Sequence, residues 1–122
     1  MRISLACLLS IGLSAEALAE CPATNVDHRL GVISSAASCD EAVRLFKKCA
    51  IGASLDGRLA LRAVENCEKR FLPNLPEARE REYRKEIEAC NAPYVSKQGT
   101  IYRSKSAHCR VSVALKYSKQ ER

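Results

Sequence analysis

The chain has 122 residues, a net charge of +6, seven cysteines, two histidines and no tryptophan. This length leaves room for one small domain and not for a second core. The five glycines are scattered and form no glycine-rich phosphate loop, and the chain is too short for a βαβ array, which excludes enzymes built on a nucleotide-binding domain.

The first nineteen residues have the pattern of an export signal. Arg2 supplies the positive end, an apolar stretch of eleven residues follows at positions 3–13, and a small-x-small cleavage site lies at positions 17–19. The apolar stretch is too short to span a bilayer, which takes about 20 residues. We therefore predict that residues 1–19 are cleaved and that residues 20–122 form one domain, exported to the periplasm or the exterior. The four asparagines form no Asn-x-Ser/Thr sequon, which favours the periplasm.

Cysteine usage agrees with export. Without Cys7 of the leader, the cysteines form an even set: Cys21, Cys39, Cys49, Cys67, Cys90 and Cys109. In an oxidising compartment such a set predicts three disulfides, which a small core needs. No pair has the C-x₂₋₄-C spacing of a zinc site, so we expect no metal and no other cofactor.

The spacing also limits the disulfide pairing. Cys39 and Cys49 would lie about 15 Å apart along one continuous helix, which is beyond disulfide reach. Antiparallel packing about a turn near residue 55 would bring Cys39 to the level of Cys67, so we expect this pair. The remaining pairings stay open.

Helical periodicity dominates residues 38–91, and a short helix is predicted within residues 24–37, with Thr24 as its capping residue. The sequence from Ser38 to Glu41 has the form of a capping box, so a helix should begin there. Its apolar positions share one face: Ala42, Leu45, Phe46, Cys49, Ala50 and Ala53. A second helix from residues 54–56 repeats the pattern up to Pro73, and the two should form an αα-hairpin.

A third helix should begin at Pro76. Its narrow apolar stripe consists of Tyr83, Ile87 and Cys90, and the rest of its surface alternates between acidic and basic residues. Such charges stabilise a solvated helix face through i,i+4 pairs, so we expect no catalytic carboxylates here.

The C-terminal segment supports two interpretations. Apolar residues alternate with polar ones at positions 109–118, as in a half-buried strand, and a hairpin between Tyr94 and Tyr102 could supply a partner. A helix beginning at Ser104 or Ser106 competes with this reading and is favoured by the helical neighbourhood. The predicted fold is thus an all-α, disulfide-stabilised domain of three to five helices, and a short β element near the C-terminus is the alternative.

Charge is distributed unevenly along the chain. Residues 20–92 carry equal numbers of acidic and basic residues, whereas residues 93–122 carry seven Lys/Arg and one Glu, and therefore the whole net charge of +6. We predict that this basic segment binds an anionic polymer, lipid headgroups or an acidic protein. The candidate anion-binding residues are Lys97, Arg103, Lys105, Arg110, Lys116 and Lys119. Nucleic acid is not favoured, because few aromatic side chains accompany the charges.

Catalytic motifs such as G-x-S-x-G, H-E-x-x-H and C-x-x-C are absent, so we expect a binding module and not an enzyme. The alternative is a secreted hydrolase. Two histidines, six cysteines, a basic surface and export resemble the pancreatic ribonucleases, which implies His28 as base, His108 as acid, and Lys105 or Arg110 at the phosphorane. The lysine motif CKxxNTF of that family is missing here.

A further alternative is an inhibitor of an envelope enzyme. The stretch from Cys39 to Leu59 resembles a bacterial lysozyme-inhibitor family with cysteine-bearing helical repeats. Common lysozymes are strongly basic, and a tight inhibitor usually presents acidic surface. The neutral-to-basic surface of this chain therefore points to a different target enzyme.

Overall fold

The computed structural model describes residues 20–121, so the predicted leader lies outside the described residues. The described chain is all-α, with five α-helices and two short 3₁₀ turns. The elements are α1 (Val26–Ser34), α2 (Cys39–Cys49), α3 (Leu55–Phe71), η1 (Leu72–Asn74), α4 (Glu77–Ala89), η2 (Ala92–Tyr94) and α5 (Thr100–Gln120). Within this range no strand forms, so the short β element is not present.

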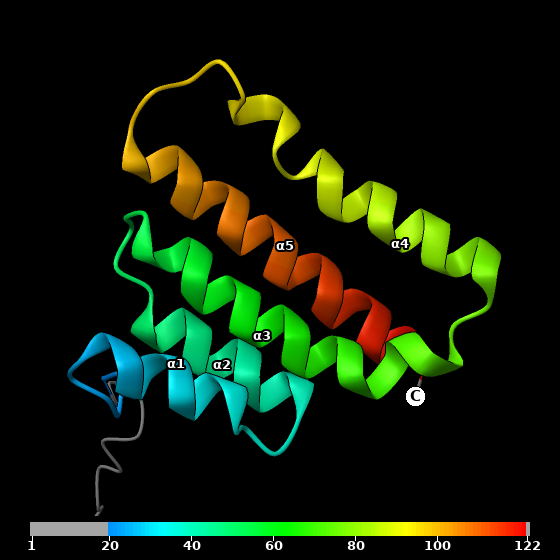
Figure 1. Cartoon of the computed structure of the whole chain (residues 1–122), viewed down its shortest axis with the longest axis horizontal. Helices are drawn as coiled ribbons and strands as arrows, with labels where there is room; N and C mark the ends of the chain where they lie inside the picture. Colours follow the sequence, from blue (N-terminus) through cyan, green and yellow to red (C-terminus); the bar gives the residue numbers. More distant parts are fainter. Residues whose placement is uncertain (1–19, 122) are drawn as a thin grey trace, which may run out of the picture.

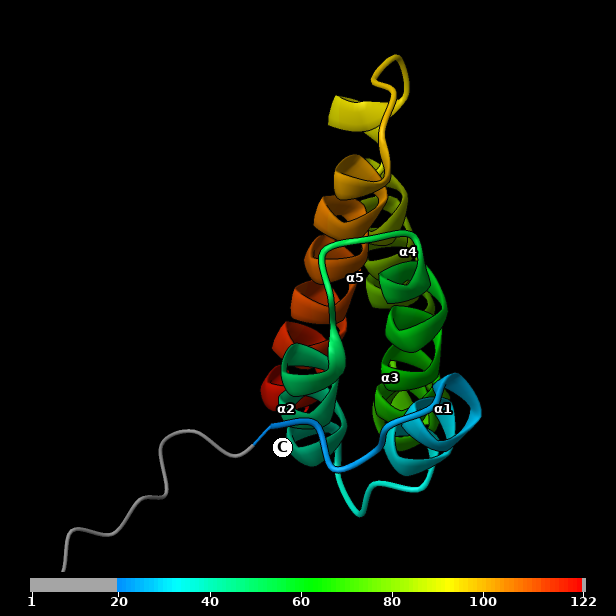
Figure 2. The same ribbon diagram turned by 90° about the vertical axis from the view of Figure 1, so that its left-hand side faces the viewer.

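Helix α3 is the centre of the packing, because it contacts α1, α2 and α5. Helix α4 lies along the other side of α5, and the two form a long hairpin that Figures 1 and 2 show from two directions. The loop between them lies at the same end of the molecule as the turn between α2 and α3 (Figure 1). The candidate site is built at this end.

The α-helical interpretation of the C-terminal segment is confirmed, but the helix begins four residues before Ser104, at Thr100. Its buried residues follow the helical period and include Ser104, Ala107, Val111, Ala114 and Ser118. The alternating pattern was misleading because Val113 and Leu115 are only partly buried at the margin of the core.

The predicted helix boundaries are confirmed in part. Ser38 caps α2, its hydroxyl accepting a hydrogen bond from Glu41 N at 3.1 Å. The cap of α1 is Asn25 and not Thr24, with Oδ1 accepting from His28 N at 2.8 Å. Helix α2 ends at Cys49, before the predicted apolar stripe reaches residue 53, because the chain is extended at residue 50 and has φ of 76° at Gly52.

All six predicted cysteines form disulfides, and the pairs are Cys21–Cys49, Cys39–Cys67 and Cys90–Cys109. The expected Cys39–Cys67 pair is therefore confirmed. The three bridges join the N-terminal segment to α2, α2 to α3, and the end of α4 to α5. Three disulfides in one small domain indicate an oxidising, exported environment.

No helix of residues 20–121 combines the length and hydropathy needed to cross a membrane.

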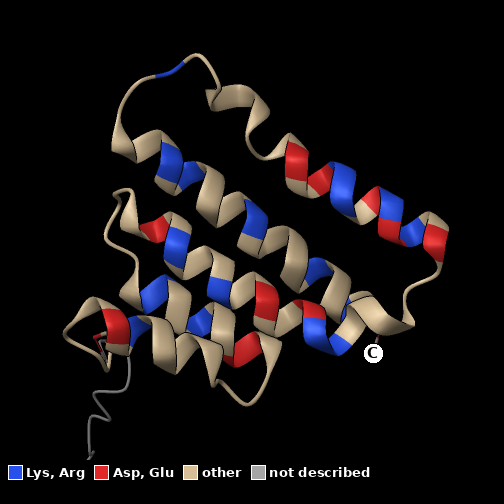
Figure 3. Cartoon of the chain, viewed as in Figure 1, with Lys and Arg blue, Asp and Glu red and all other residues tan. Residues whose placement is uncertain are grey.

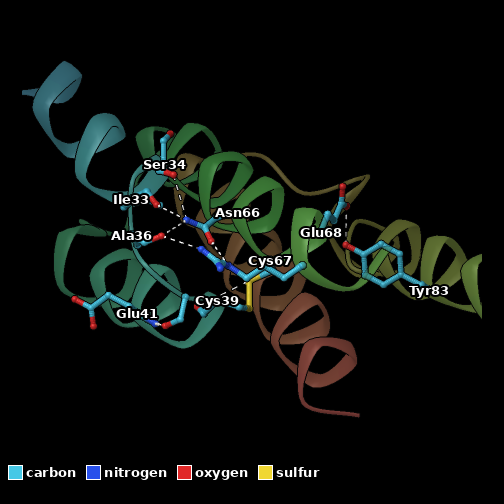
Figure 4. The surroundings of a disulfide bond; sticks show 11 residues. Ile33, Ser34, Ala36, Cys39, Glu41, Asn66, Cys67, Glu68 and Tyr83 are labelled. Atoms are coloured by element: carbon cyan, nitrogen blue, oxygen red, sulfur yellow. Dashed lines mark hydrogen bonds between the residues drawn. A yellow bond between two sulfur atoms is a disulfide. The ribbon is translucent and has the colours of Figure 1, made fainter. Parts of the chain in front are cut away.

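A buried amide holds α1 against α3. Asn66 Nδ2 donates to three carbonyl oxygens at the end of α1 and just beyond it, those of Ile33, Ser34 and Ala36, at 3.0–3.2 Å. Figure 4 shows this amide directed at the three carbonyls, beside the Cys39–Cys67 bridge. Asn66 thus supplies a donor to carbonyl oxygens at the C-terminal end of α1, where intrahelical partners run out.

Candidate functional site

A cleft of about 550 Å³ opens where the loop before α5, the first turns of α5 and the start of α3 meet. Lys97 lines it from the loop, and Arg103 and Arg110 line it from α5. Polar groups, among them Asn91, Gln98 and two serines, complete much of the lining, and no Asp or Glu belongs to it. We call this hollow, with its three cations Lys97, Arg103 and Arg110, the basic cleft.

The helical repeat explains why two arginines share the basic cleft. Arg103 and Arg110 are seven residues apart, which is two turns, and therefore lie on one face of α5. Ser106 lies between them on the same face and donates a hydrogen bond to Asn91 Oδ1. This bond joins α5 to the segment preceding the loop.

Charge on α5 has a single sign. The helix carries five Lys/Arg and no Asp or Glu, whereas α4 alternates between the two signs (Figure 3). On α4 the charges pair locally, with Arg81–Glu77 at 3.2 Å and Arg84–Glu80 at 2.9 Å. The predicted i,i+4 pairing of that face is thus present, and those carboxylates neutralise their own helix.

Arg110 is the deepest cation of the set. Its Nε atom is buried and has no hydrogen-bond partner among the described residues. A buried donor without an acceptor is costly in free energy, so the position of Arg110 in the cleft wall is not explained by a hydrogen bond of this atom within the described residues.

Two tyrosines form part of the cleft wall. The rings of Tyr94 and Tyr102 stack with centroids 5.9 Å apart. The ammonium groups of Lys97 and Lys105 lie 5.3 and 5.6 Å from the Tyr102 ring centroid, which is cation–π range. Tyr102 therefore contacts two of the predicted anion-binding residues, of which Lys97 lines the cleft.

The structure does not bring all six predicted cations together. Lys116 pairs with Glu86 of α4 at 2.8 Å, and this lysine holds the pKa of the Glu86 carboxyl below its ordinary value. Lys119 lies on the last turn of α5, far along the helix from the basic cleft. The candidate set thus reduces to Lys97, Arg103 and Arg110, with Lys105 beside them.

Asp56 organises this end of the molecule and was not among the sequence candidates. Its side chain is fully buried in the first turn of α3. The carboxylate accepts from Ile51 N at 2.8 Å, Gly52 N at 2.9 Å and Ser104 Oγ at 2.6 Å. An acidic residue just inside a predicted helix start, after a glycine-containing turn, is the signal that could have identified it.

The start of α5 adds to the positive potential of the basic cleft. Gly99 precedes α5 and lines the cleft, and this helix has no side-chain cap and no acidic residue in its first turn, whereas the first turn of α3 carries the buried Asp56 carboxylate. The first N–H groups of a helix carry partial positive charge, which favours anions nearby.

The two histidines do not form a joint site. His28 is exposed in the first turn of α1, and His108 lies on α5 with its ring 4.8 Å from that of Phe46 on α2. No hydrogen bond or ring contact between His28 and His108 occurs within residues 20–121. In the same range no group of three His, Cys, Asp or Glu side chains could hold a metal ion.

A second hollow of about 600 Å³ lies beside the C-terminal half of α3. It is lined by two basic and two acidic residues, of which Arg62 and Glu65 pair at 3.5 Å. Its charges balance, so it lacks the electrostatic selectivity of the basic cleft.

Comparisons with protein-family models, curated proteins and solved structures found no match to the chain.

Proposed function

We propose that the protein is a non-catalytic binding module, exported to the periplasm, that holds an anionic component of the cell envelope in the basic cleft. One observation carries the proposal: three cations line the cleft and no carboxylate does. An acidic partner protein is the other class of ligand that this chemistry would accept.

Physical chemistry explains why an anion would bind here. Cations gathered in a concave surface raise the local concentration of anions and speed their association. Arg103 and Arg110 offer planar groups that bind phosphate, sulfate or carboxylate in bidentate fashion. Lys97, on the loop, can adapt to ligands of different size.

The test uses a heparin oligosaccharide as a soluble anionic probe, with binding measured by calorimetry at low and at physiological salt. We expect binding at low salt that weakens steeply as salt rises, because screening shortens the range of exposed charges. The variant Arg103→Gln/Arg110→Gln should lose most of this affinity.

The matched control is Lys47→Gln/Lys119→Gln, which removes the same charge from exposed positions on α2 and the end of α5. If the affinity follows net charge alone, the two double variants will weaken binding equally, and the assignment to the basic cleft is wrong. If the unmodified protein fails to bind at low salt, the proposed function itself is wrong.

Export by a cleaved leader is part of the same proposal. It is supported by the pattern of residues 1–19 and by the three disulfides. Intact-mass analysis of the protein expressed from the full sequence, after alkylation without reductant, tests it. A chain that begins at Glu20 with no alkylated thiol is expected. A full-length chain with alkylated thiols would contradict export.

A further inference from the structure

Exposed apolar side chains gather around the same end of the molecule as the basic cleft. Among residues 20–121, five large apolar residues are exposed, and three of them are Ile51, Val95 and Ile101, at 59%, 81% and 48% exposure. We call these three residues the apolar rim. The other two, Val26 and Leu61, lie on α1 and α3.

The fold holds the apolar rim close to the basic cleft. Val95 itself lines the cleft, and a β-carbon placed on Gly52 would lie 3.9 Å from Ile101 Cδ1. The turn that carries Ile51 is fixed to α5 through Asp56, which binds both Ile51 N and Ser104 Oγ. Figure 2 views the molecule from this end, with the α2–α3 turn, the loop before α5 and the start of α5 on the facing side.

From this arrangement we infer that the end of the molecule docks on an anionic phospholipid bilayer, with the apolar rim inserted among the lipids and headgroup phosphates held by the basic cleft. The inference rests on the proposed function and names its ligand. Peripheral proteins bind membranes by this combination of buried apolar area and attraction to anionic lipid.

A bilayer fits these observations better than a soluble polyanion. A polysaccharide or polyphosphate would satisfy the cations and leave Ile51, Val95 and Ile101 in water. The interfacial region of a bilayer receives both kinds of group. It also suits tyrosine, whose ring is apolar and whose hydroxyl is polar, and Tyr94 and Tyr102 line the cleft together with the cations.

The experiment uses a tryptophan reporter, because the chain contains no tryptophan. Val95→Trp places the reporter on the apolar rim, and Asn74→Trp places a control on the exposed turn between α3 and α4, at the opposite end (Figure 1). Each is titrated with vesicles of phosphatidylcholine containing phosphatidylglycerol, and with phosphatidylcholine alone. We expect a blue shift for Val95→Trp with the anionic vesicles and none for Asn74→Trp.

Two variants separate insertion from charge. Ile51→Ser, at a position of the apolar rim that does not line the cleft, should lower the vesicle partition coefficient about tenfold through the lost apolar area, and should leave heparin affinity unchanged. Arg103→Gln/Arg110→Gln should lower both, with a loss of roughly fivefold for each charge at the membrane. Both should keep the circular dichroism spectrum of the parent protein and a cooperative urea transition, which shows that the losses reflect binding and not unfolding.

The outcomes distinguish this inference from the proposed function. Heparin binding without vesicle binding, or vesicle binding in which the Val95→Trp emission stays unshifted, overturns membrane insertion and leaves the proposed function standing. Equal shifts for both reporters also overturn it, because they would show non-specific adsorption. Failure to bind either heparin or vesicles removes the proposed function and the inference together.

Discussion

The carboxylate of Asp56 on α3 accepts a 2.6 Å hydrogen bond from the hydroxyl of Ser104 on α5, and both side chains are buried. The same carboxylate holds the backbone N–H groups of Ile51 and Gly52. One side chain thus positions the turn of the apolar rim and the helix that carries two arginines of the basic cleft.

Replacement of Asp56 should therefore destabilise the fold. Asp56→Ala leaves the buried Ser104 hydroxyl and two partly buried backbone donors without their acceptor, and we expect a loss of about 3 kcal/mol in the free energy of unfolding. Urea denaturation followed by circular dichroism measures it. Glu88→Ala, at an exposed acidic position on α4, is the control and should stay within about 0.5 kcal/mol of the parent. Equal effects at the two positions would contradict the assigned role of Asp56.

Asn66→Asp should be costly even though it preserves shape. The amide nitrogen faces three carbonyl oxygens, and a carboxylate oxygen in its place would repel all of them. Arg70 donates from Nε to Asn66 Oδ1 at 3.1 Å, so its positive charge can stabilise only the carboxylate oxygen at that position and not the one that faces the carbonyls. We expect a loss above about 3 kcal/mol at neutral pH.

The pH dependence of the stability of Asn66→Asp distinguishes electrostatic repulsion from altered packing. A protonated aspartic acid can donate one hydrogen bond to the carbonyls, so the deficit relative to the parent should shrink as pH falls. Urea unfolding at neutral and mildly acidic pH measures the difference. If the loss in the free energy of unfolding does not change with pH, altered packing causes it, and repulsion by the three carbonyl oxygens does not.

The disulfides should be reduced in a defined order. Both residues of Cys39–Cys67 are buried, whereas Cys21 and Cys109 are only half-buried. Because reduction requires a thiolate to reach a sulfur atom, Cys39–Cys67 should be the last bridge to open under mild reductant. Timed alkylation and peptide mass analysis follow the order. Early labelling of Cys39 or Cys67 would refute it.

The sequence predicted the helices well where a local signal was strong. The capping box at Ser38 and the proline at position 76 mark helix starts through contacts within four residues, so no tertiary information is needed. The Cys39–Cys67 pair followed from the geometry of an αα-hairpin. The early start of α5 and the early end of α2 were missed. Asp56 makes a long-range contact near each boundary, with Ser104 on α5 and with the N–H groups of Ile51 and Gly52 after α2, and no local sequence pattern reveals such contacts.

The candidate site was predicted in part. The charge imbalance pointed to the segment whose cations line the basic cleft, because composition alone reveals seven cations against one acid in residues 93–122. Which cations share a face depends on where the helix begins and on its neighbour. Lys116 is paired because α4 places Glu86 beside it, and no pattern within residues 93–122 contains that information.

A buried phenol makes stability sensitive to alkaline pH. Burial, and after it the hydrogen bond to Glu68 Oε1 at 2.7 Å, raises the pKa of Tyr83 well above the ordinary tyrosine value. Figure 4 shows this hydroxyl directed at the carboxylate. The unfolded chain releases the proton near pH 10 while the folded chain retains it. The free energy of unfolding should therefore be unaffected by this group below that pH and should fall as pH rises above it.

Tyr83→Phe isolates the effect. Without the hydroxyl, the variant should be about 1 kcal/mol less stable than the parent at neutral pH, through the lost hydrogen bond. It should approach or exceed the stability of the parent above about pH 10, because it has no proton to retain. Both proteins share the titration of their lysines and of Tyr117, so the difference between their urea midpoints reports Tyr83 alone. A gap that stays constant across this range would mean that the phenol titrates alike in the folded and unfolded chains, and that Glu68 does not hold its proton.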